Sequence, residues 1–331
     1  MEPISKETWE EIISNQNHSL IGTNIPKQGN GYHDGISWRI PFRVNKNRNE
    51  ELYNSSFFNV YLRDLSNFIN PSYSRKNKFR EGLKVNKCSK NYLNTLKKYF
   101  GGDNYYSENI LHELGEWSRR LIYKGRVIFE IVGWYDNDSN QFYGFQLYLL
   151  DNDYCKIGSK NVIFRAPISE NDGELEYKKV KIPKGKCIII EFPKFHGGYN
   201  GYKKKIKKVL NLGSQFNFSL DSNTSLTHMK NWDKNINKIS SDWGTYNSNL
   251  DHTEFYKEYS AFKFIKTAVL CTHEIIGGFR FLINYLNKKL SEEAILEFNI
   301  KEYSLDYFEE MERKWMNGNL SFKEANEFLK F

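Results

Sequence analysis

The stretch RVIFEIVGWY, residues Arg126–Tyr135, decides which kind of fold this chain adopts. Its residues are mostly β-branched or aromatic, and such residues favour strands. It stops at DNDSN, residues 136–140, a cluster of residues that form turns. Phe142–Leu150 then repeats the strand composition. The sequence therefore predicts an antiparallel hairpin, preceded at Gly125 by a change in apolar spacing from about 3.6 residues to about 2.

Three further stretches downstream of the hairpin have strand composition, namely residues 154–166, 175–182 and 187–192. Turn sequences separate the last three stretches, at residues 171–173 and 183–185. We therefore expect a central antiparallel sheet of about five strands. Edge strands often carry lysine, because its charge prevents pairing with a further strand. Lysines of this kind are Lys178, Lys179, Lys181, Lys184 and Lys186.

Helical spacing dominates the chain before the sheet. Residues 17–50 are rich in Asn, Gly and Lys and predict a long loop. A helix that precedes Asn70-Pro71 ends there, because the residue before a proline favours extended backbone. Residues 72–90 are basic and weakly apolar, and no element is expected in them. Apolar residues three and four positions apart predict helices over residues 5–13, 51–69, 92–100 and 107–123.

Helical spacing returns after the sheet. Residues 199–212 follow the pair Gly197-Gly198, and a long helix is predicted over Glu254–Leu290. The pair Gly277-Gly278 inside the long helix indicates a kink or a close approach of two backbones. Residues 294–300 predict a short strand. Further helices are predicted over residues 223–239 and 305–316, and from Ser321, which forms a capping-box pattern with Glu324.

The order of helices, sheet and helices predicts an α+β fold for the 331 residues. We divide the chain into a helical N-terminal region with a long loop (residues 1–123), a β-rich domain (124–195) and a helical C-terminal region with one long helix (196–331). This length corresponds to one large domain or two ordinary ones.

The formal net charge of +8 and the isoelectric point of about 9.0 suit an acidic partner such as nucleic acid. The excess is spread thinly, with 29 basic and 23 acidic side chains in residues 1–195 and 19 and 17 in residues 196–331. The four cysteines are far apart, which fits a reducing compartment. No apolar run approaches roughly 18 residues, and the N-terminus lacks the features of a signal peptide. We therefore expect a soluble protein with no membrane partner.

Signatures of catalysis and cofactor binding are weak. The sequence has no phosphate-binding loop, dinucleotide fingerprint or nucleophile elbow. The run HELGE, residues 112–116, begins like a zinc-protease motif but lacks the second histidine one helical turn later. We therefore expect no cofactor and no metal, and a non-enzymatic role more than a catalytic one. An enzyme with a site assembled from distant residues stays open as an alternative, with His112, His196 and His273 as its participants.

One dense cluster of positive charge stands out, KKKIKK at residues 203–208. On a helix, Lys204 and Lys208 would line one side, while Tyr202 and Ile206 would turn inward. Such lysines bind phosphates as point charges without reading bases. A solvated helix face with no ligand is the structural alternative.

Several segments follow one another in a characteristic order. LIYKGRVIFE (residues 121–130) is followed by a hairpin that ends at Leu149-Leu150-Asp151, then by IPKGKCIII (residues 182–190) and the loop and helix at Gly197-Gly198. Near the end, WMNGNLSFKEA (residues 315–325) joins a helix stop to an acidic helix start. In order and composition, these segments resemble tailed-phage portal proteins.

The resemblance implies a viral structural protein, a homo-oligomeric ring through which DNA passes during packaging. It also implies docking surfaces for capsid and packaging proteins, and a location in the virion or the host cytoplasm. The lysines would contact DNA phosphates loosely, because a tight or base-specific grip would stop translocation. The side chains expected at this nucleic-acid contact are Lys203, Lys204, Lys207, Lys208, Lys263 and Lys266.

A second hypothesis is a basic nucleic-acid-associated protein of a defence or mobile-element system. It would use the same cluster, residues 203–208, and bind arbitrary DNA or RNA. Its binding would weaken as salt concentration rises, because phosphate contacts release counterions. It requires no ring.

Overall fold

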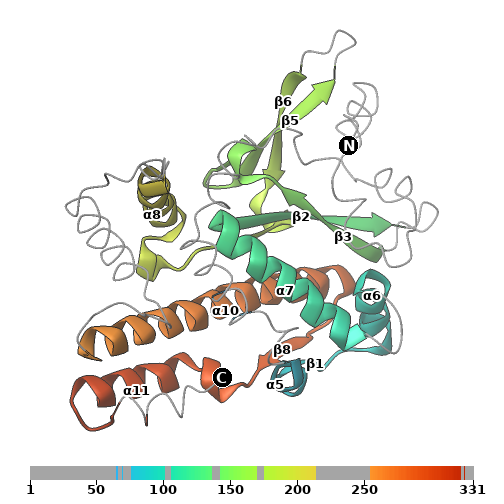
Figure 1. Cartoon of the computed structure of the whole chain (residues 1–331). Coiled ribbons are helices and arrows are strands. Elements are labelled where there is room, and N and C mark those ends of the chain that lie inside the picture. The colour runs from blue at the N-terminus through green and yellow to red at the C-terminus, as the bar shows by residue number, and fades with distance from the viewer. Residues whose placement is uncertain are drawn as a thin grey trace.

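The α+β class is confirmed by the computed structural model, in which helices and antiparallel sheets follow one another along the chain (Figure 1). The residues that the structure describes are Leu65, Ile69, 76–100, 106–135, 142–169, 175–213, 254–321 and Glu324. Among these helices, none combines the length and the apolar composition needed to cross a bilayer.

A three-stranded antiparallel sheet contains the predicted hairpin. In spatial order it consists of β3 (Phe142–Leu150), β2 (Arg126–Tyr135) and β7 (Cys187–Glu191). Ile128 of β2 lies opposite Leu150 of β3, and Arg126 lies opposite Glu191 of β7. The predicted hairpin is confirmed, with both strands beginning and ending at the expected residues.

The other strands of the β-rich region form a second antiparallel sheet, and not one sheet with the hairpin as we expected. Residues 154–166 do not form one strand, because a turn divides them in which the Gly158 N–H donates to the Asn161 carbonyl at 2.8 Å. The described strands of the region therefore lie in two sheets of three. The second sheet consists, in order, of β4 (Cys155–Ile157), β5 (Asn161–Ser169) and β6 (Leu175–Pro183).

A small apolar core joins one face of the first sheet to one face of the second. Side chains alternate between faces along a strand, and Ile128 of β2 and Val162 and Phe164 of β5 point into this core. Two short 3-10 helices, η2 (Asn152–Tyr154) and η3 (Lys184–Lys186), connect the sheets. The buried residues of the core are Ile128, Leu150, Val162, Phe164, Ile182 and Cys187.

Helices cover the opposite face of the first sheet and form the main core. Trp117 is fully buried, and its ring centroid lies 5.0 Å from that of Phe129 on the sheet and 6.4 Å from that of Phe279. Aromatic residues with large buried areas dominate this core, which draws on all three predicted regions of the chain. The helices are α6 (Lys90–Phe100), α7 (Tyr106–Lys124) and α10 (Glu254–Leu290), and all three were predicted.

The long helix α10 runs without interruption through Gly277-Gly278. A Cβ atom on Gly278 would lie 2.8 Å from the Ile190 side chain and 3.1 Å from that of Ile188, both on β7. Gly277 faces open space. Of the two roles considered for this glycine pair, the structure shows close approach of the helix to the sheet, because Gly278 has no side chain to keep them apart.

A two-stranded sheet joins segments that are far apart in sequence. Val85 of β1 (Leu83–Asn86) lies opposite Leu296 of β8 (Ile295–Phe298). The strand β8 confirms the prediction for residues 294–300. The strand β1 and the preceding helix α5 (Lys76–Gly82) lie where no element was expected. Such a short strand carries no clear period and depends on a partner more than 200 residues later.

The helix predicted over residues 305–316 is confirmed as α11 (Leu305–Met316), which follows the 3-10 helix η6 (Lys301–Tyr303). The Ser304 side chain caps it by accepting a hydrogen bond from the Tyr307 N–H. α11 packs against α10 through the Phe262 and Trp315 rings, which stack with centroids 4.4 Å apart. At Ser321, the predicted capping box is present, because the Glu324 carboxylate accepts from the Ser321 N–H at 2.8 Å.

Some predicted elements fall outside the described residues. These are the helices over residues 5–13 and 223–239, the loop over residues 17–50, and most of the helix over residues 51–69. Of this last helix, Leu65 and Ile69 are described; both are helical and buried in the main core.

Candidate nucleic-acid interface

The lysine cluster lies on helix α8 (Gly198–Gly213), which packs by its apolar side as predicted. Tyr202 and Ile206 are buried, and the Tyr202 hydroxyl donates to the Ile122 carbonyl at 2.7 Å. The Tyr202 ring lies against the backbone of Gly125, where a Cβ atom would be 2.1 Å from it. Gly125 also has a φ of +70°, which favours glycine. The tyrosine therefore fixes α8 to the end of α7.

A tight turn leads from β7 into α8. The 3-10 helix η4 (Lys194–His196) is followed by Gly197 and Gly198, with φ of +81° and +61°, so the chain reverses through the left-handed region. The first turn of α8 then lies against η4, because a Cβ on Gly201 would be only 1.9 Å from the His196 carbonyl oxygen. Three glycines thus determine where α8 starts.

Four exposed lysines lie on η4 and α8, and we call them the α8 basic face: Lys194, Lys203, Lys204 and Lys207. The Lys203 ammonium lies 5.0 Å from the centroid of the Tyr199 ring. No ion pair joins any of the four to a carboxylate of the described residues. The charge of Lys194 also acts on the Glu274 carboxyl, whereas the charges of Lys203, Lys204 and Lys207 are available to an anionic ligand. The Lys208 side chain, also predicted as a contact, lies outside the described part of the chain.

The two lysines predicted on α10 have other surroundings. The Lys266 ammonium forms an ion pair with Glu312 of α11 at 2.7 Å, and it lies 5.0 Å from the centroid of the Phe195 ring. Its charge therefore already stabilises the contact between two helices. Lys263 is half-buried, and its carbonyl accepts a hydrogen bond from the Thr267 hydroxyl at 2.8 Å. The structure places both lysines close to η4.

A buried histidine, His196 of η4, links α8 to α10. The Thr267 hydroxyl donates to Lys263, so its oxygen accepts from the His196 Nε2–H at 2.6 Å. The other ring nitrogen, Nδ1, then accepts from the Lys205 ammonium at 2.8 Å. Burial, followed by the positive charges of Lys205 and Lys263, lowers the pKa of His196 to about 3. His196 is therefore neutral near pH 7 and connects α8 to α10 by hydrogen bonds.

Lowering the pH is expected to weaken this connection. Between the unfolded pKa of 6.5 and the folded pKa of about 3, the unfolded chain binds a proton at His196 and the folded chain does not. Stability is complete above pH 6.5 and falls below it, by about 2 kcal/mol between pH 6.5 and 4.5 for this group. The variant His196→Gln keeps a side-chain hydrogen-bond donor, the amide N–H, but its side chain does not bind a proton in this pH range. The free energy of unfolding of this variant, measured with urea, should fall less between about pH 6.5 and 4.5 than that of the unmodified protein. An equal fall in the two proteins would contradict the role of a neutral His196 in this connection.

The three histidines considered for an enzyme site lie in different surroundings. His112 is exposed on α7, whereas His273 on α10 hydrogen-bonds through Nε2 to the Tyr303 carbonyl at 2.5 Å. His196 faces Thr267. Among the described residues, no group of three or more His, Cys, Asp or Glu side chains is placed to hold a metal ion.

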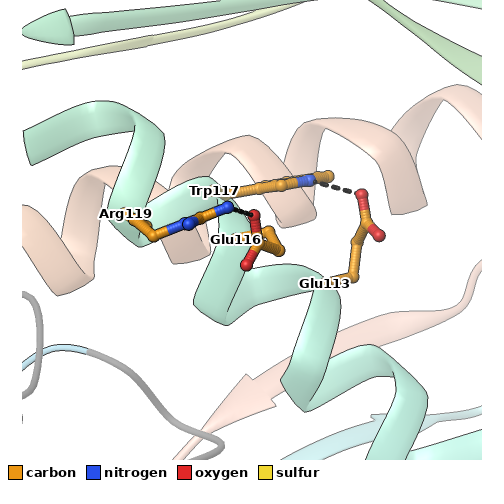
Figure 2. Close-up of polar contacts among 4 residues, drawn as sticks. All are labelled: Glu113, Glu116, Trp117 and Arg119. Carbon is orange, nitrogen blue, oxygen red and sulfur yellow. Dashed lines mark hydrogen bonds and ion pairs between the residues drawn. The ribbon is translucent and has the colours of Figure 1, made fainter. Parts of the chain in front are cut away.

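The HELGE run lies on α7 and is engaged in helix packing (Figure 2). The Trp117 indole N–H donates to Glu113 at 2.9 Å, and both side chains are buried. One turn away, Arg119 and Glu116 form an ion pair at 2.6 Å, with the Arg119 side chain 58% exposed. Glu113 therefore positions a core tryptophan, which is a structural role.

Sequence reasoning missed a polar cluster at the start of α8. The Arg126 guanidinium lies 3.8 Å from the centroid of the Tyr199 ring and forms an ion pair with Glu191 at 2.6 Å. Burial, then the charge of Asp153, raises the pKa of Tyr199. Burial, then the charge of Asp151, raises the pKa of the nearby Cys155 thiol to about 12. These groups come from β2, β4, β7, η2 with its N-cap, and α8, so no local pattern in the sequence indicates their proximity.

No protein-family model matches this chain, and no curated protein matches it in sequence. Function must therefore be inferred from the residues themselves. The α8 basic face is a candidate contact for an anionic ligand, because its exposed lysines lie on η4 and on α8, a helix that is fixed on two sides by Tyr202 and His196.

Proposed function

We propose that this protein contacts the phosphate backbone of nucleic acid through the α8 basic face. The observation that carries the proposal is the exposure of Lys194, Lys203, Lys204 and Lys207 with no ion pair to a described carboxylate. Lysine ammonium groups interact with phosphates as point charges on flexible stems, and they do not select a base. The contact is therefore independent of sequence and sensitive to salt.

The rigid attachment of α8 supports this function. Tyr202 is anchored on Ile122, and the side chain of Lys205 is directed to His196, so the helix presents its other lysines from a fixed base. Fixed cations lose less freedom on binding than cations on a mobile segment. The contact would keep DNA close to α10 through weak interactions with its phosphates that do not fix it in one position.

The test is binding of a 30-base-pair DNA duplex of arbitrary sequence, followed by fluorescence anisotropy between 50 and 200 mM salt. The variant K203E/K204E/K207E is expected to raise Kd at least about tenfold at 100 mM salt and to reduce the slope of log K against log salt by about 2 to 3. The control K84E/K90E/K288E changes the net charge equally at exposed lysines elsewhere. If the two variants bind alike, the α8 basic face is not the contact.

We further propose that copies of the chain assemble into a portal-like ring around DNA. The support is the order of segments that resembles portal proteins, together with the elements that these segments form. Residues 121–130 form the end of α7 and the start of β2, and residues 182–190 lead through β7 to the glycine turn before α8. In a ring, cyclic symmetry would place the α8 basic face of every subunit at equivalent positions, and we propose that these positions line the channel.

The ring is tested with the full chain by light scattering and negative-stain electron microscopy over a range of concentrations. A closed ring of subunits with a central channel is the expected result. A monomer at all concentrations would contradict the ring. If that monomer still binds DNA through α8, the second hypothesis of a nucleic-acid-associated protein is favoured.

A further inference from the structure

The outer face of the second sheet is defined by the alternation of side chains along its strands. Val162, Phe164 and Ile182 point from β5 and β6 into the small core. The intervening residues must therefore point to the opposite face. In the register, Lys156 of β4 lies opposite Ile163 of β5, and Ile163 lies opposite Lys181 of β6. Figure 1 shows β5 and β6 projecting on the side of the molecule away from α10 and α11.

Four cations gather on this outer face, and we call them the sheet basic face: Lys156, Arg165, Lys179 and Lys181. All four are exposed. None forms an ion pair with a carboxylate whose side chain the structure describes, a set that excludes the side chains of residues 166–178. The positions of β5 and β6 on this face carry no Asp or Glu. The positive charge of this face is therefore not balanced within the sheet.

Two of the cations lie directly opposite each other. Arg165 of β5 is paired with Lys179 of β6 in the antiparallel register. Like charges in such a pair destabilise a sheet. Protection of an edge strand explains lysines on β6, but β5 is the central strand of its sheet, so that explanation does not cover Arg165. An anion bound between the two would remove the repulsion.

We propose that the sheet basic face is a second binding surface for the nucleic-acid phosphate backbone. This inference rests on the proposed contact with nucleic acid and adds a surface separate from the α8 basic face. Adjacent strands lie about 4.8 Å apart, and residues two apart on one strand about 6.7 Å, so neighbouring cations are spaced by about 5 to 10 Å. A DNA duplex carries one negative charge per about 1.7 Å of its axis, which supplies a phosphate for each cation.

Nucleic acid fits this face better than an acidic protein does. Interfaces between proteins depend on buried aromatic or aliphatic anchors at their centre. The described centre of this face offers Ile163, which is only half-buried, between long cationic side chains. Phosphate contacts need no such anchor, since they are made by cations at the surface.

The experiment measures binding of the same 30-base-pair duplex by the full-length variant K156Q/R165Q/K179Q/K181Q. Its control, K84Q/K90Q/R280Q/K288Q, removes the same charge at exposed positions elsewhere. The sheet variant is expected to raise Kd at least about tenfold at 100 mM salt and to reduce the salt slope by about 3, and the control much less. Equal Kd values and slopes for the two variants would overturn the proposal.

The single variant K179E separates ligand binding from a structural role. It places opposite charges across the strands, so the melting temperature of the unbound protein should rise by about 1 to 3 °C. Binding of the duplex should nevertheless weaken severalfold. A change in oligomeric state with unchanged DNA binding would instead identify this face as an interface between copies, which overturns the proposal.

The two basic faces are distinguishable in parallel measurements. If K203E/K204E/K207E loses binding and the sheet variant binds as well as the control, the sheet proposal fails and the proposed function stands. If only the sheet variant loses binding, the α8 contact fails and the sheet proposal stands. If the unmodified protein binds no duplex at 50 mM salt, both fail.

Discussion

Gly201→Ala is expected to destabilise the protein by about 3 kcal/mol or more. A Cβ atom at this position would lie 1.9 Å from the His196 carbonyl oxygen and 2.8 Å from its carbon. Both are backbone atoms, so the clash is not relieved by a change of side-chain rotamer, and α8 has to move away from η4. That movement would also pull Lys205 from His196 and Tyr202 from Ile122.

The measurement is urea unfolding of the unmodified protein and of Gly201→Ala, with Gly185→Ala as the control. A Cβ on Gly185 meets no atom within 4 Å, so the same chemical change there should alter the free energy of unfolding by about 0.5 kcal/mol or less. Similar small effects at both glycines would show that α8 is not held close to η4. Loss of duplex binding in Gly201→Ala would link the position of α8 to the nucleic-acid contact.

Trp117→Ala is expected to cost about 3 to 5 kcal/mol of folding stability. The indole is fully buried between Phe129 of β2 and Phe279 of α10, so its loss opens a cavity where α7, the sheet and the long helix meet. It also removes the donor that hydrogen-bonds the buried Glu113 carboxylate (Figure 2). Loss of this hydrogen bond adds to the cost of the cavity.

Arg119→Ala on the same helix is the matched control. Its ion pair with Glu116 lies at the surface, and exposed pairs contribute about 0 to 1 kcal/mol, so the variant should unfold close to the unmodified protein. Thermal and urea unfolding of both variants would be compared by circular dichroism. A Trp117→Ala variant as stable as Arg119→Ala would contradict the central position of the indole.

The sequence by itself determined the elements whose signals are local. The hairpin of β2 and β3, the bounds of α10 and α11, and the inward side of α8 were all predicted correctly, because apolar period, turn residues and caps act over a few positions. Lys203, Lys204 and Lys207 of the α8 basic face were found in the same way, whereas Lys194 joined them only in the structure, through the turn at η4. Each of the predicted features is specified by neighbours in the chain.

Only the tertiary structure decided the arrangements that join distant segments. The division of the strands into two sheets, the pairing of β1 with β8, and the ion pair of Lys266 with Glu312 all depend on contacts between residues that no local period connects. The sheet basic face is of this kind as well. Lys179 and Lys181 were attributed to edge protection, and Lys156 was not singled out. The like-charge pair of Lys179 with Arg165 emerged only from the register, because strand pairing is a non-local choice set by the whole core.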